Sequence, residues 1–497
     1  MGTMKIGWAE ESLVPDQKVS LGGQFFERIS QYVESEITAT AMAVECDGDV
    51  AIIVSADVIA LSEEGLALIR ENFARLTDEV APEKVIVGAT HTHTSLRLAV
   101  PGTTRKATPR AIVEELMPEG MKYEVLVERS TDVMSDEDAL YFAAERVAKA
   151  AYNAWKNRVP ARIANEFGRA AVGMCRRVSY DDGSAQMWGD TNTANFVALE
   201  GGNDSGVELL YTFDENKKLM GVVANIACPA QILEQRSFIS ADYWGRARAI
   251  LREKLGKDVY LLGMCGAAGD QCPRDLVRWV QPETPIDDPN VHRPNPLPRK
   301  ADPSMYDISG CNRAGKRIAN EIASVFEEIE DMQDEAVFRH KVIHLDLPLR
   351  KATMADYENA VREIKYYLAN KQKDEPFNFE DVARLHVHAG AIARYRMQQE
   401  TEVINIEYHV IRLGNIAIVT NPFELFLDYG NRMKARSKSH QTFIMQLSCG
   451  ASGYLPTEKA EKAGHYSAYI SSGKVGHEGG DLFTRETINE INKMFTE

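Results

Sequence analysis

The 497-residue sequence shows no membrane-spanning segment, no visible export signal and no excess of basic residues. No run approaches the roughly 18 consecutive apolar residues that a transmembrane helix needs. The first residues, MGTMKIGWAEESL, lack the basic region and apolar run of a signal peptide. The formal net charge of −16 argues against a nucleic-acid-binding surface, which would need a basic field.

Cysteine is also scarce, with seven residues in an odd number and no regular spacing. In a chain without a visible export signal, this predicts reduced thiols and a cytoplasmic protein. Because 44% of the residues are hydrophobic and 26% are charged, we expect an ordinary globular protein. We expect residues 1–497 to form a single large domain.

The opening part of the chain predicts two strands, a helix and a third strand. Apolar strands at 38–44 and 50–54 are joined by turn-forming residues, and a helix starts at Ser62. A continuous β-branched strand, 85–87, follows. This order predicts an α/β fold in which a layered, mixed β-sheet is flanked by helices. Further strands are expected at 206–213, 219–226, 259–262, 402–412, 415–420 and 443–447.

Two insertions are expected in this domain. The proline-rich segment at about 283–304 is typical of an extended, exposed loop. Two charged helical patterns within about 353–400 predict a helical hairpin laid on the sheet.

Polar side chains follow five of the expected strands at the point where each strand ends. His91 and His93 point to the same side of an extended chain because they are two residues apart. Open α/β sheets bind ligands at the carboxyl ends of their strands. The strand ends therefore predict one site that contains His91, His93, Cys228, Cys265, Asp270, Glu424 and Tyr454. Because loops after strands are generally polar, an accidental pattern is the alternative.

The residue types at these strand ends indicate zinc chemistry. Histidine, cysteine and glutamate are zinc ligands, and three protein ligands plus water form the open, catalytic arrangement. Such a metal lowers the pKa of its bound water to about 7. Arg176 or Arg177 could stabilise the oxyanion that forms. Asp57 and Asp242 could orient ligands, although Asp242 could equally cap a helix.

Six segments resemble the N-terminal catalytic domain of the neutral/alkaline (non-lysosomal) ceramidases, and they occur in the same order. They are GATHTHTS at 88–95, NIACPAQ at 225–231, SADYWG at 240–245, GAAGDQCP at 266–273, NPFEL at 421–425 and SGYLPTE at 452–458. The resemblance implies an α/β zinc amidohydrolase. It implies zinc on His91, Glu424 and Tyr454, with His93 and Arg176 contacting the reacting carbonyl or oxyanion.

The sequence departs from the family pattern in three ways. The second zinc histidine of the family falls on Cys228, whose thiolate is also a competent zinc ligand. The family's active serine falls on Gly266, which leaves no hydroxyl next to Cys265 and Asp270. We expect Cys265 to be a buried structural thiol. The family's C-terminal β-sandwich is expected to be absent, which favours a small soluble substrate over ceramide.

Three hypotheses follow from these residues. The first is a zinc-dependent hydrolase that cleaves an amide, or an ester, of a small molecule with zinc-activated water, His93 as proton shuttle and Arg176 at the oxyanion. The second is a non-catalytic relative that binds a ligand without turnover. The third is a hydrolase of glycosidic or other ester bonds, in which Glu424 would pair with Asp270 or Asp242.

Overall fold

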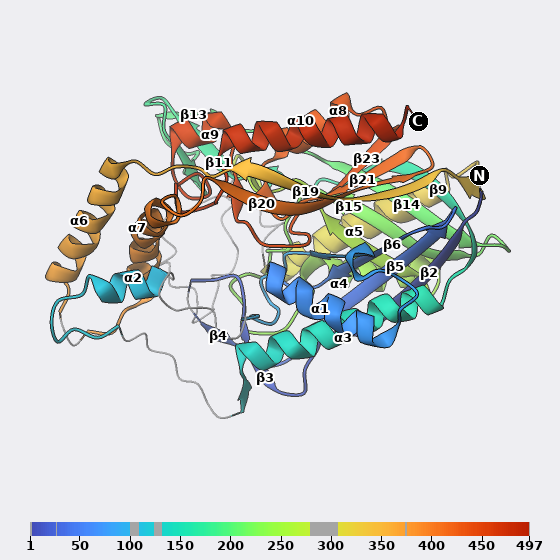
Figure 1. Ribbon diagram of the computed structural model, residues 1–497, viewed down its shortest axis with the longest axis horizontal. Helices are drawn as coiled ribbons and strands as arrows, with labels where there is room; N and C mark the ends of the chain where they lie inside the picture. The colour runs from blue at the N-terminus through green and yellow to red at the C-terminus, as the bar shows by residue number, and fades with distance from the viewer. Residues whose placement is uncertain are drawn as a thin grey trace.

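The computed structural model describes residues 2–25, 27–99, 109–123, 132–278, 307–372 and 375–496. The proline-rich segment expected at 283–304 lies outside the described residues. Two β-sheets are stacked face to face, and helices cover both outer faces (Figure 1). The chain is therefore an α/β protein with helices around a mixed sheet, as predicted.

The larger sheet has eight strands in the order β16-β15-β14-β9-β2-β5-β6-β7. The two edge pairs, β6–β7 and β15–β16, are parallel, and the inner pairs are antiparallel. These strands are β2 (Lys5–Ser12), β5 (Thr38–Cys46), β6 (Asp49–Ala56), β7 (Val85–Ala89), β9 (Val159–Arg169), β14 (Gly206–Asp214), β15 (Leu219–Ile226) and β16 (Tyr260–Cys265).

The smaller sheet has the order β19-β20-β21-β23, with β21 and β23 parallel. Its strands are β19 (Phe338–Pro348), β20 (Val403–Leu413), β21 (Ile416–Thr420) and β23 (Gln441–Met445). Short strands and helices lie around the two sheets: β1 (Gly2–Thr3), β3 (Lys18–Leu21), β4 (Arg28–Ile29), η1 (Pro82–Lys84), β8 (Val133–Met134), β10 (Met174–Cys175), β11 (Arg177–Tyr180), β12 (Ala185–Met187), β13 (Phe196–Leu199), β17 (Gln271–Cys272), β18 (Glu335–Ala336), β22 (Glu424–Leu425), β24 (Tyr454–Leu455) and α9 (Glu458–Ala463).

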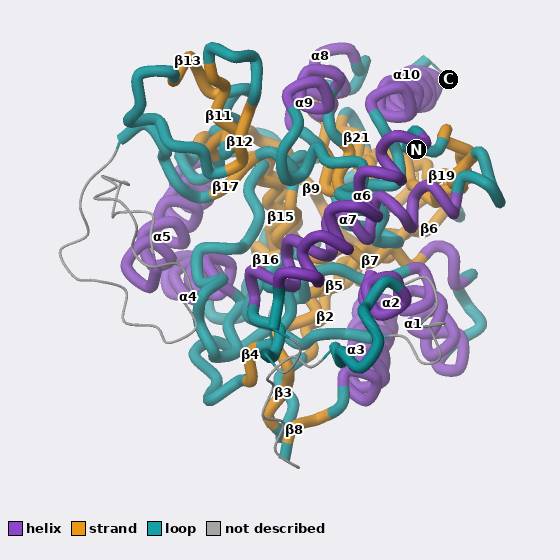
Figure 2. The backbone as a smooth tube through the Cα atoms, turned by 90° about the vertical axis from the view of Figure 1, so that its left-hand side faces the viewer, coloured by secondary structure: helices purple, strands orange, loops and turns teal. Residues whose placement is uncertain are grey.

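Helices complete a four-layer arrangement of helix, sheet, sheet and helix (Figures 1 and 2). The outer face of the larger sheet is covered by α1 (Glu63–Leu76), α3 (Asp136–Lys156), α4 (Asp242–Leu255) and α5 (Asp307–Phe326). The outer face of the smaller sheet is covered by α8 (Leu427–Arg436) and α10 (His477–Met494). Within the described part of the chain, no helix combines the length and the apolar character needed to cross a membrane.

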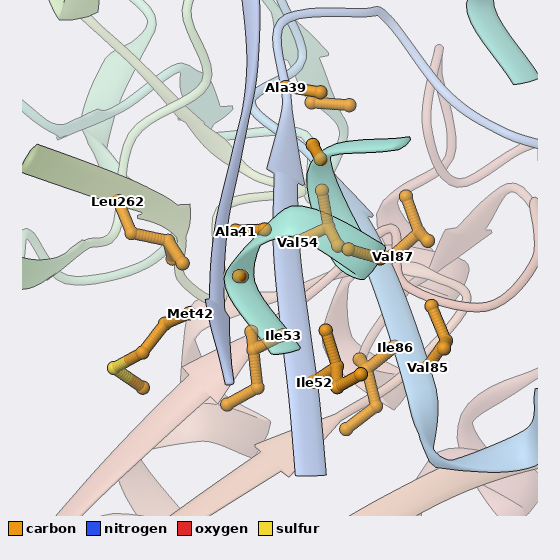
Figure 3. Close-up of a cluster of buried hydrophobic side chains, with 14 of the residues drawn as sticks. Ala39, Ala41, Met42, Ile52, Ile53, Val54, Val85, Ile86, Val87 and Leu262 are labelled. Carbon is orange, nitrogen blue, oxygen red and sulfur yellow. The ribbon is translucent and has the colours of Figure 1, made fainter. Parts of the chain in front are cut away.

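The main core lies around the larger sheet and continues into the space between the two sheets. Figure 3 shows apolar side chains of β5, β6 and β7 gathered in one cluster, with Ile52, Ile86 and Val87 among them. Buried residues of the smaller sheet, such as Ile418 and Phe443, belong to the same cluster. Burial on both faces explains why these strands are continuous apolar runs in the sequence.

The helical hairpin is present but does not lie on the sheet. Its helices are α6 (Met354–Asn370) and α7 (Phe379–Met397), and capping boxes at Thr353 and Asn378 fix where they begin. Their apolar faces pack on each other and on α2 (Pro109–Glu115), forming a separate apolar cluster. Figure 1 shows the three helices together at the left of the molecule. The prediction of its position was wrong because amphipathicity does not specify the partner.

Two long strands and one helix start have weak sequence signals. In β2 the apolar run is interrupted by Gly7, where a Cβ would meet the Ala154 carbonyl oxygen of α3 at 2.1 Å. In β19 apolar and polar residues alternate only over 343–347, a signal that a search for continuous apolar runs misses. The closing helix α10 begins at His477, and its first turn contains Gly480, which packs against the ring of Tyr429 and weakens the helical signal.

Asn225 of β15 is a polar connection between the two sheets. Its side-chain amide donates to the Ile444 carbonyl of β23 at 2.8 Å, and its side-chain oxygen accepts the Ile444 N–H at 3.0 Å. Asn225 is fully enclosed, with 2% of its surface exposed. The reciprocal pair fixes the position of β23 against the larger sheet, which an apolar side chain alone would not do.

We expect Asn225→Leu to lower the free energy of unfolding by about 2–4 kcal/mol, because it leaves a buried N–H and a buried carbonyl unpaired. Denaturant unfolding would measure the loss. Asn216→Leu, in the exposed β14–β15 turn, is the matched control and should stay within about 0.5 kcal/mol of the unmodified protein. Equal effects of the two substitutions would contradict the role of Asn225.

Candidate active site

His91 lies on the loop directly after β7, in a left-handed backbone conformation with φ 64°. The loop is held by Asp57, which accepts a hydrogen bond from Thr90 Oγ1 at 3.1 Å, and by the His91 N–H, which donates to the Val58 carbonyl. His91 Nδ1 lies 2.6 Å from the Ile59 carbonyl oxygen. Because a carbonyl only accepts, Nδ1 carries the proton and the Nε2 lone pair is left free.

The free nitrogen of His91 faces Glu424. Its Nε2 lies 3.6 Å from Glu424 Oε2. Glu424 is held in place by β22, which pairs in parallel with β24 so that Glu424 is the register partner of Tyr454. The predicted residues of three strand ends therefore meet at one place.

Arg176, at the end of β10, completes this group from a fully buried position. Its Nη2 donates to the Gly269 carbonyl at 2.9 Å and to Tyr454 Oη at 3.3 Å, and it lies 4.0 Å from Glu424 Oε2. Its Nη1 donates to Gln231 Oε1 at 3.2 Å. Burial lowers the pKa of Arg176, but Tyr454 and Glu424 raise it more, so the guanidinium keeps its charge.

Arg177 points elsewhere, which decides between the two arginines suggested by the sequence. Its guanidinium pairs with Glu200 at 2.5 Å and donates to the backbone at Tyr466 and Gly464. Successive residues of a strand face opposite sides, so only one of the pair can reach the site. That residue is Arg176.

His93 lies beside His91, with the two ring centroids 4.8 Å apart. Neither ring nitrogen of His93 makes a hydrogen bond of normal geometry, although the backbone of Gly23 lies against the ring. Its Nδ1 is 3.7 Å from Glu234 Oε2. Burial, followed by electrostatic repulsion from the neighbouring His91 ring and from the Arg28 and Arg176 guanidinium groups, holds the pKa of His93 well below its usual range. The neutral ring has one donor and one acceptor available for a ligand.

Asp270 and Cys265 have backbone partners close to this group. Asp270 Oδ1 accepts the Leu427 N–H at 2.9 Å, and the Asp270 carbonyl accepts the Arg176 N–H. Cys265 Sγ donates to the Cys228 carbonyl at 3.4 Å and accepts from Gln446 Nε2 at 3.3 Å. Burial raises the pKa of the Cys265 thiol to about 12, so the thiol stays protonated, as a structural cysteine would.

Cys228 and Gly266 are the two positions where the chain departs from the family pattern. Cys228 is fully buried in the apolar cluster around α4 and α5, and its Sγ lies 3.6 Å from the Pro229 carbonyl. Burial raises the pKa of this thiol well above its usual range. A Cβ on Gly266 would lie 3.2 Å from backbone atoms of Ala227, so space for a side chain is tight.

Asp242 bonds both a loop and the first turn of α4. Its Oδ2 accepts the Leu233 N–H at 2.8 Å, which holds the turn after Cys228 and Gln231. The helix α4 has Ala241 at its N-cap position, with no side-chain cap. Asp242 Oδ1 nevertheless accepts the Tyr243 N–H at 2.7 Å, and a role in orienting ligands stays a prediction.

Three side chains near this group have no clear sequence signal. Gln231 bonds Arg176, Glu234 lies near His93, and Tyr466 packs against Tyr454 with ring centroids 5.5 Å apart. Gln231 and Glu234 follow β15 by five and eight residues, and only the fold of that loop returns them to the site. Of the three, Gln231 alone falls within one of the recognisable segments, 225–231.

The two stacked sheets and the buried His, Glu, Tyr and Arg at their strand ends define an α/β protein with a polar centre between loops. The chain matches no protein-family model, and no curated protein is significantly similar to it. Its structure is similar to that of a neutral ceramidase from Pseudomonas aeruginosa, with a TM-score of 0.66 and 13% identity over 99% of this chain and 75% of that one.

A ceramidase solved in complex with C2 also has a TM-score of 0.66, with 11% identity over 100% of this chain and 76% of that one. The protein therefore has a neutral-ceramidase-like fold with a strongly diverged sequence. This confirms the resemblance at the level of the fold. The roles of the individual site residues stay predictions.

Burial raises the pKa of the Asp270 carboxyl to about 6, compared with 3.8 in the unfolded chain. Between these values the folded protein keeps a proton that the unfolded chain has lost, so stability falls as pH rises from about 4 to 6. Because asparagine cannot ionise, we expect Asp270→Asn to reduce this fall in the free energy of unfolding by up to roughly 3 kcal/mol. Denaturant midpoints across this range would measure it, and an unchanged pH slope would contradict the assignment. Asp258→Asn, at an exposed position, is the control.

Proposed function

We propose that the protein is a zinc-dependent hydrolase that cleaves the amide bond, or an ester bond, of a small soluble substrate. The observation that carries this proposal is the pair His91 Nε2 and Glu424 Oε2, 3.6 Å apart with the histidine lone pair directed at the carboxylate. Two ligands of a tetrahedral zinc, each about 2.0–2.2 Å from the metal, lie roughly 3.4 Å apart. The geometry therefore fits one cation between the two side chains.

His91, Glu424 and Tyr454 would hold the zinc. When bound, zinc polarises a carbonyl oxygen and lowers the pKa of water towards neutrality. The backbone bond from His91 Nδ1 to the Ile59 carbonyl keeps the ring in the tautomer that a metal requires. The parallel pair of β22 and β24 holds Glu424 and Tyr454 together without help from a ligand.

Two further side chains would perform the proton and charge steps. His93 is neutral, has no good hydrogen bond of its own and lies next to His91, so it can accept a proton and return it to the leaving group. Arg176 is charged and fixed by the Gly269 carbonyl and Gln231, so its guanidinium can stabilise an oxyanion without rearranging. Asp270 and Gln446 position the backbone around both groups.

The missing hydroxyl at Gly266 favours a second candidate, a ligand-binding protein that has lost turnover. Such a protein would keep the polar centre and be stabilised by its ligand without converting it. The glycosidic alternative has less support, because the carboxylates of Asp270 and Asp242 both accept backbone N–H groups. A cytoplasmic location also stays a prediction.

We expect His91→Ala and Glu424→Ala each to lose one equivalent of zinc relative to the unmodified protein, because each removes one of the facing ligand atoms. Metal analysis after dialysis against trace zinc would measure this. His440→Ala, which removes an exposed histidine, should keep the full zinc content. A zinc content that neither His91→Ala nor Glu424→Ala changes would refute the proposed metal site.

With a panel of N-acyl compounds, esters, glycosides and phosphate esters, we expect turnover of an N-acyl compound or an ester. His93→Ala should lower kcat by about 10²–10⁴-fold, the usual contribution of general acid–base catalysis, while leaving the zinc content unchanged. Ligand-induced thermal stabilisation without any turnover would instead establish the binding protein. Turnover of a glycoside alone would establish the third hypothesis.

A further inference from the structure

A second group of metal-ligand side chains lies outside the candidate active site. Glu407 and His409 are on β20, and Cys449 lies on the loop after β23. One ligand atom from each of the three lies within 4.8 Å of the others. Among the His, Cys, Asp and Glu residues that the structure describes, this is the only group of three with that geometry. His409 and Cys449 are buried, and the Glu407 side chain is 15% exposed.

The hydrogen bonds around His409 leave one of its nitrogens directed at the other two residues. His340 Nδ1 lies 2.8 Å from the Val50 carbonyl, so this nitrogen carries a proton and donates it. The neutral His340 ring then has an acceptor at Nε2, which takes the proton of His409 Nδ1 at 2.9 Å. His409 Nε2 consequently presents a lone pair to Glu407 Oε1 at 2.9 Å and to Cys449 Sγ at 3.5 Å.

The distances suit a small cation with nitrogen, oxygen and sulfur ligands. Around a tetrahedral zinc, a histidine nitrogen and a cysteine sulfur lie roughly 3.6 Å apart, and a nitrogen and a carboxylate oxygen roughly 3.4 Å apart. The Cys449 sulfur already lies close to that distance from His409 Nε2. The Glu407 carboxylate needs to move away from His409 Nε2 by a few tenths of an ångström. Cys449 is held in a left-handed conformation, φ 58°, with its N–H donating to the Val87 carbonyl.

Arg70 of α1 supports the carboxylate from the opposite side. It donates to both oxygens of Glu407, at 2.7 and 3.0 Å, which leaves one lone pair of Oε1 for His409 or a metal. Without a metal, the Cys449 thiol can donate to His409 Nε2, which leaves Glu407 Oε1 facing the same nitrogen without a proton between them. A second proton on His409 would instead make a buried imidazolium next to Arg70. That arrangement places two cations around one carboxylate, whereas a metal would bring in the Cys449 thiolate as a second anion.

We propose that Glu407, His409 and Cys449 form a second divalent-metal site, suited to zinc and distinct from the His91–Glu424 pair. Its role is structural, because it would join β20 to the loop that contains Cys449. This loop bonds the end of β7 and leads to Tyr454. Borderline-soft metals prefer this mixed nitrogen, sulfur and oxygen set over Mg²⁺ or Ca²⁺, which take oxygen ligands. The inference does not rest on the proposed hydrolase activity.

Cobalt substitution of the full chain tests this site, because only a thiolate ligand gives Co²⁺ a sulfur charge-transfer absorption in the near ultraviolet. After metal removal and addition of Co²⁺, we expect the band in the unmodified protein, in Cys228→Ser and in His91→Ala. We expect its loss in Cys449→Ser, together with one equivalent less zinc. Cys228→Ser is the matched control, since it removes the thiol that falls on the family's second zinc histidine.

No thiolate band in the unmodified protein would overturn the proposal, and so would a band lost in Cys228→Ser but kept in Cys449→Ser. Should Cys449→Ser not fold, zinc X-ray absorption of Cys228→Ser decides the question. A sulfur neighbour at about 2.3 Å supports the site, and a shell of nitrogen and oxygen alone refutes it. Loss of the active-site metal in His91→Ala with the band retained would show that the two sites are independent.

Discussion

The buried guanidinium of Arg176 is the constraint that organises the candidate site. Moving a cation out of water costs several kcal/mol unless neighbouring groups compensate it, and Arg176 is almost fully enclosed. Its partners come from three separate segments: Gln231 after β15, Gly269 after β16, and Tyr454 of β24, with Glu424 close by. The loops must converge to satisfy one charge, and their convergence brings the reactive side chains together.

Backbone carbonyls near the two ends of β6 each bond a histidine. The Ile59 carbonyl fixes the proton of His91, and the Val50 carbonyl, acting through His340, fixes the proton of His409. Both carbonyls belong to β6 or the loop that follows it. In each case the outer nitrogen is left unprotonated and directed at a glutamate. Val50 is held by strand pairing within β6, whereas Ile59 lies three residues after the strand, on the loop whose Val58 carbonyl also accepts the His91 N–H.

Sequence patterns predicted the parts of this molecule that depend on local properties. The continuous apolar strand 85–87 and the polar residues at five strand ends identified His91, Glu424 and Tyr454, which do lie together. The approach of Glu234 to His93 could not be predicted, because it depends on how the loop after β15 folds. The helical hairpin was recognised by its period, but its packing on α2 rather than on the sheet depends on tertiary partners.

Gly266 shows why a lost residue cannot be replaced independently of its surroundings. A Cβ at this position would lie 3.2 Å from the Cα and N of Ala227, and the Gly266 N–H already donates to the Ile226 carbonyl at 2.7 Å. The backbone of this turn is therefore packed against the end of β15 with little room for a hydroxyl. Under the proposed function, the proton and charge steps would fall to His93 and Arg176, which lie on the loops around this turn.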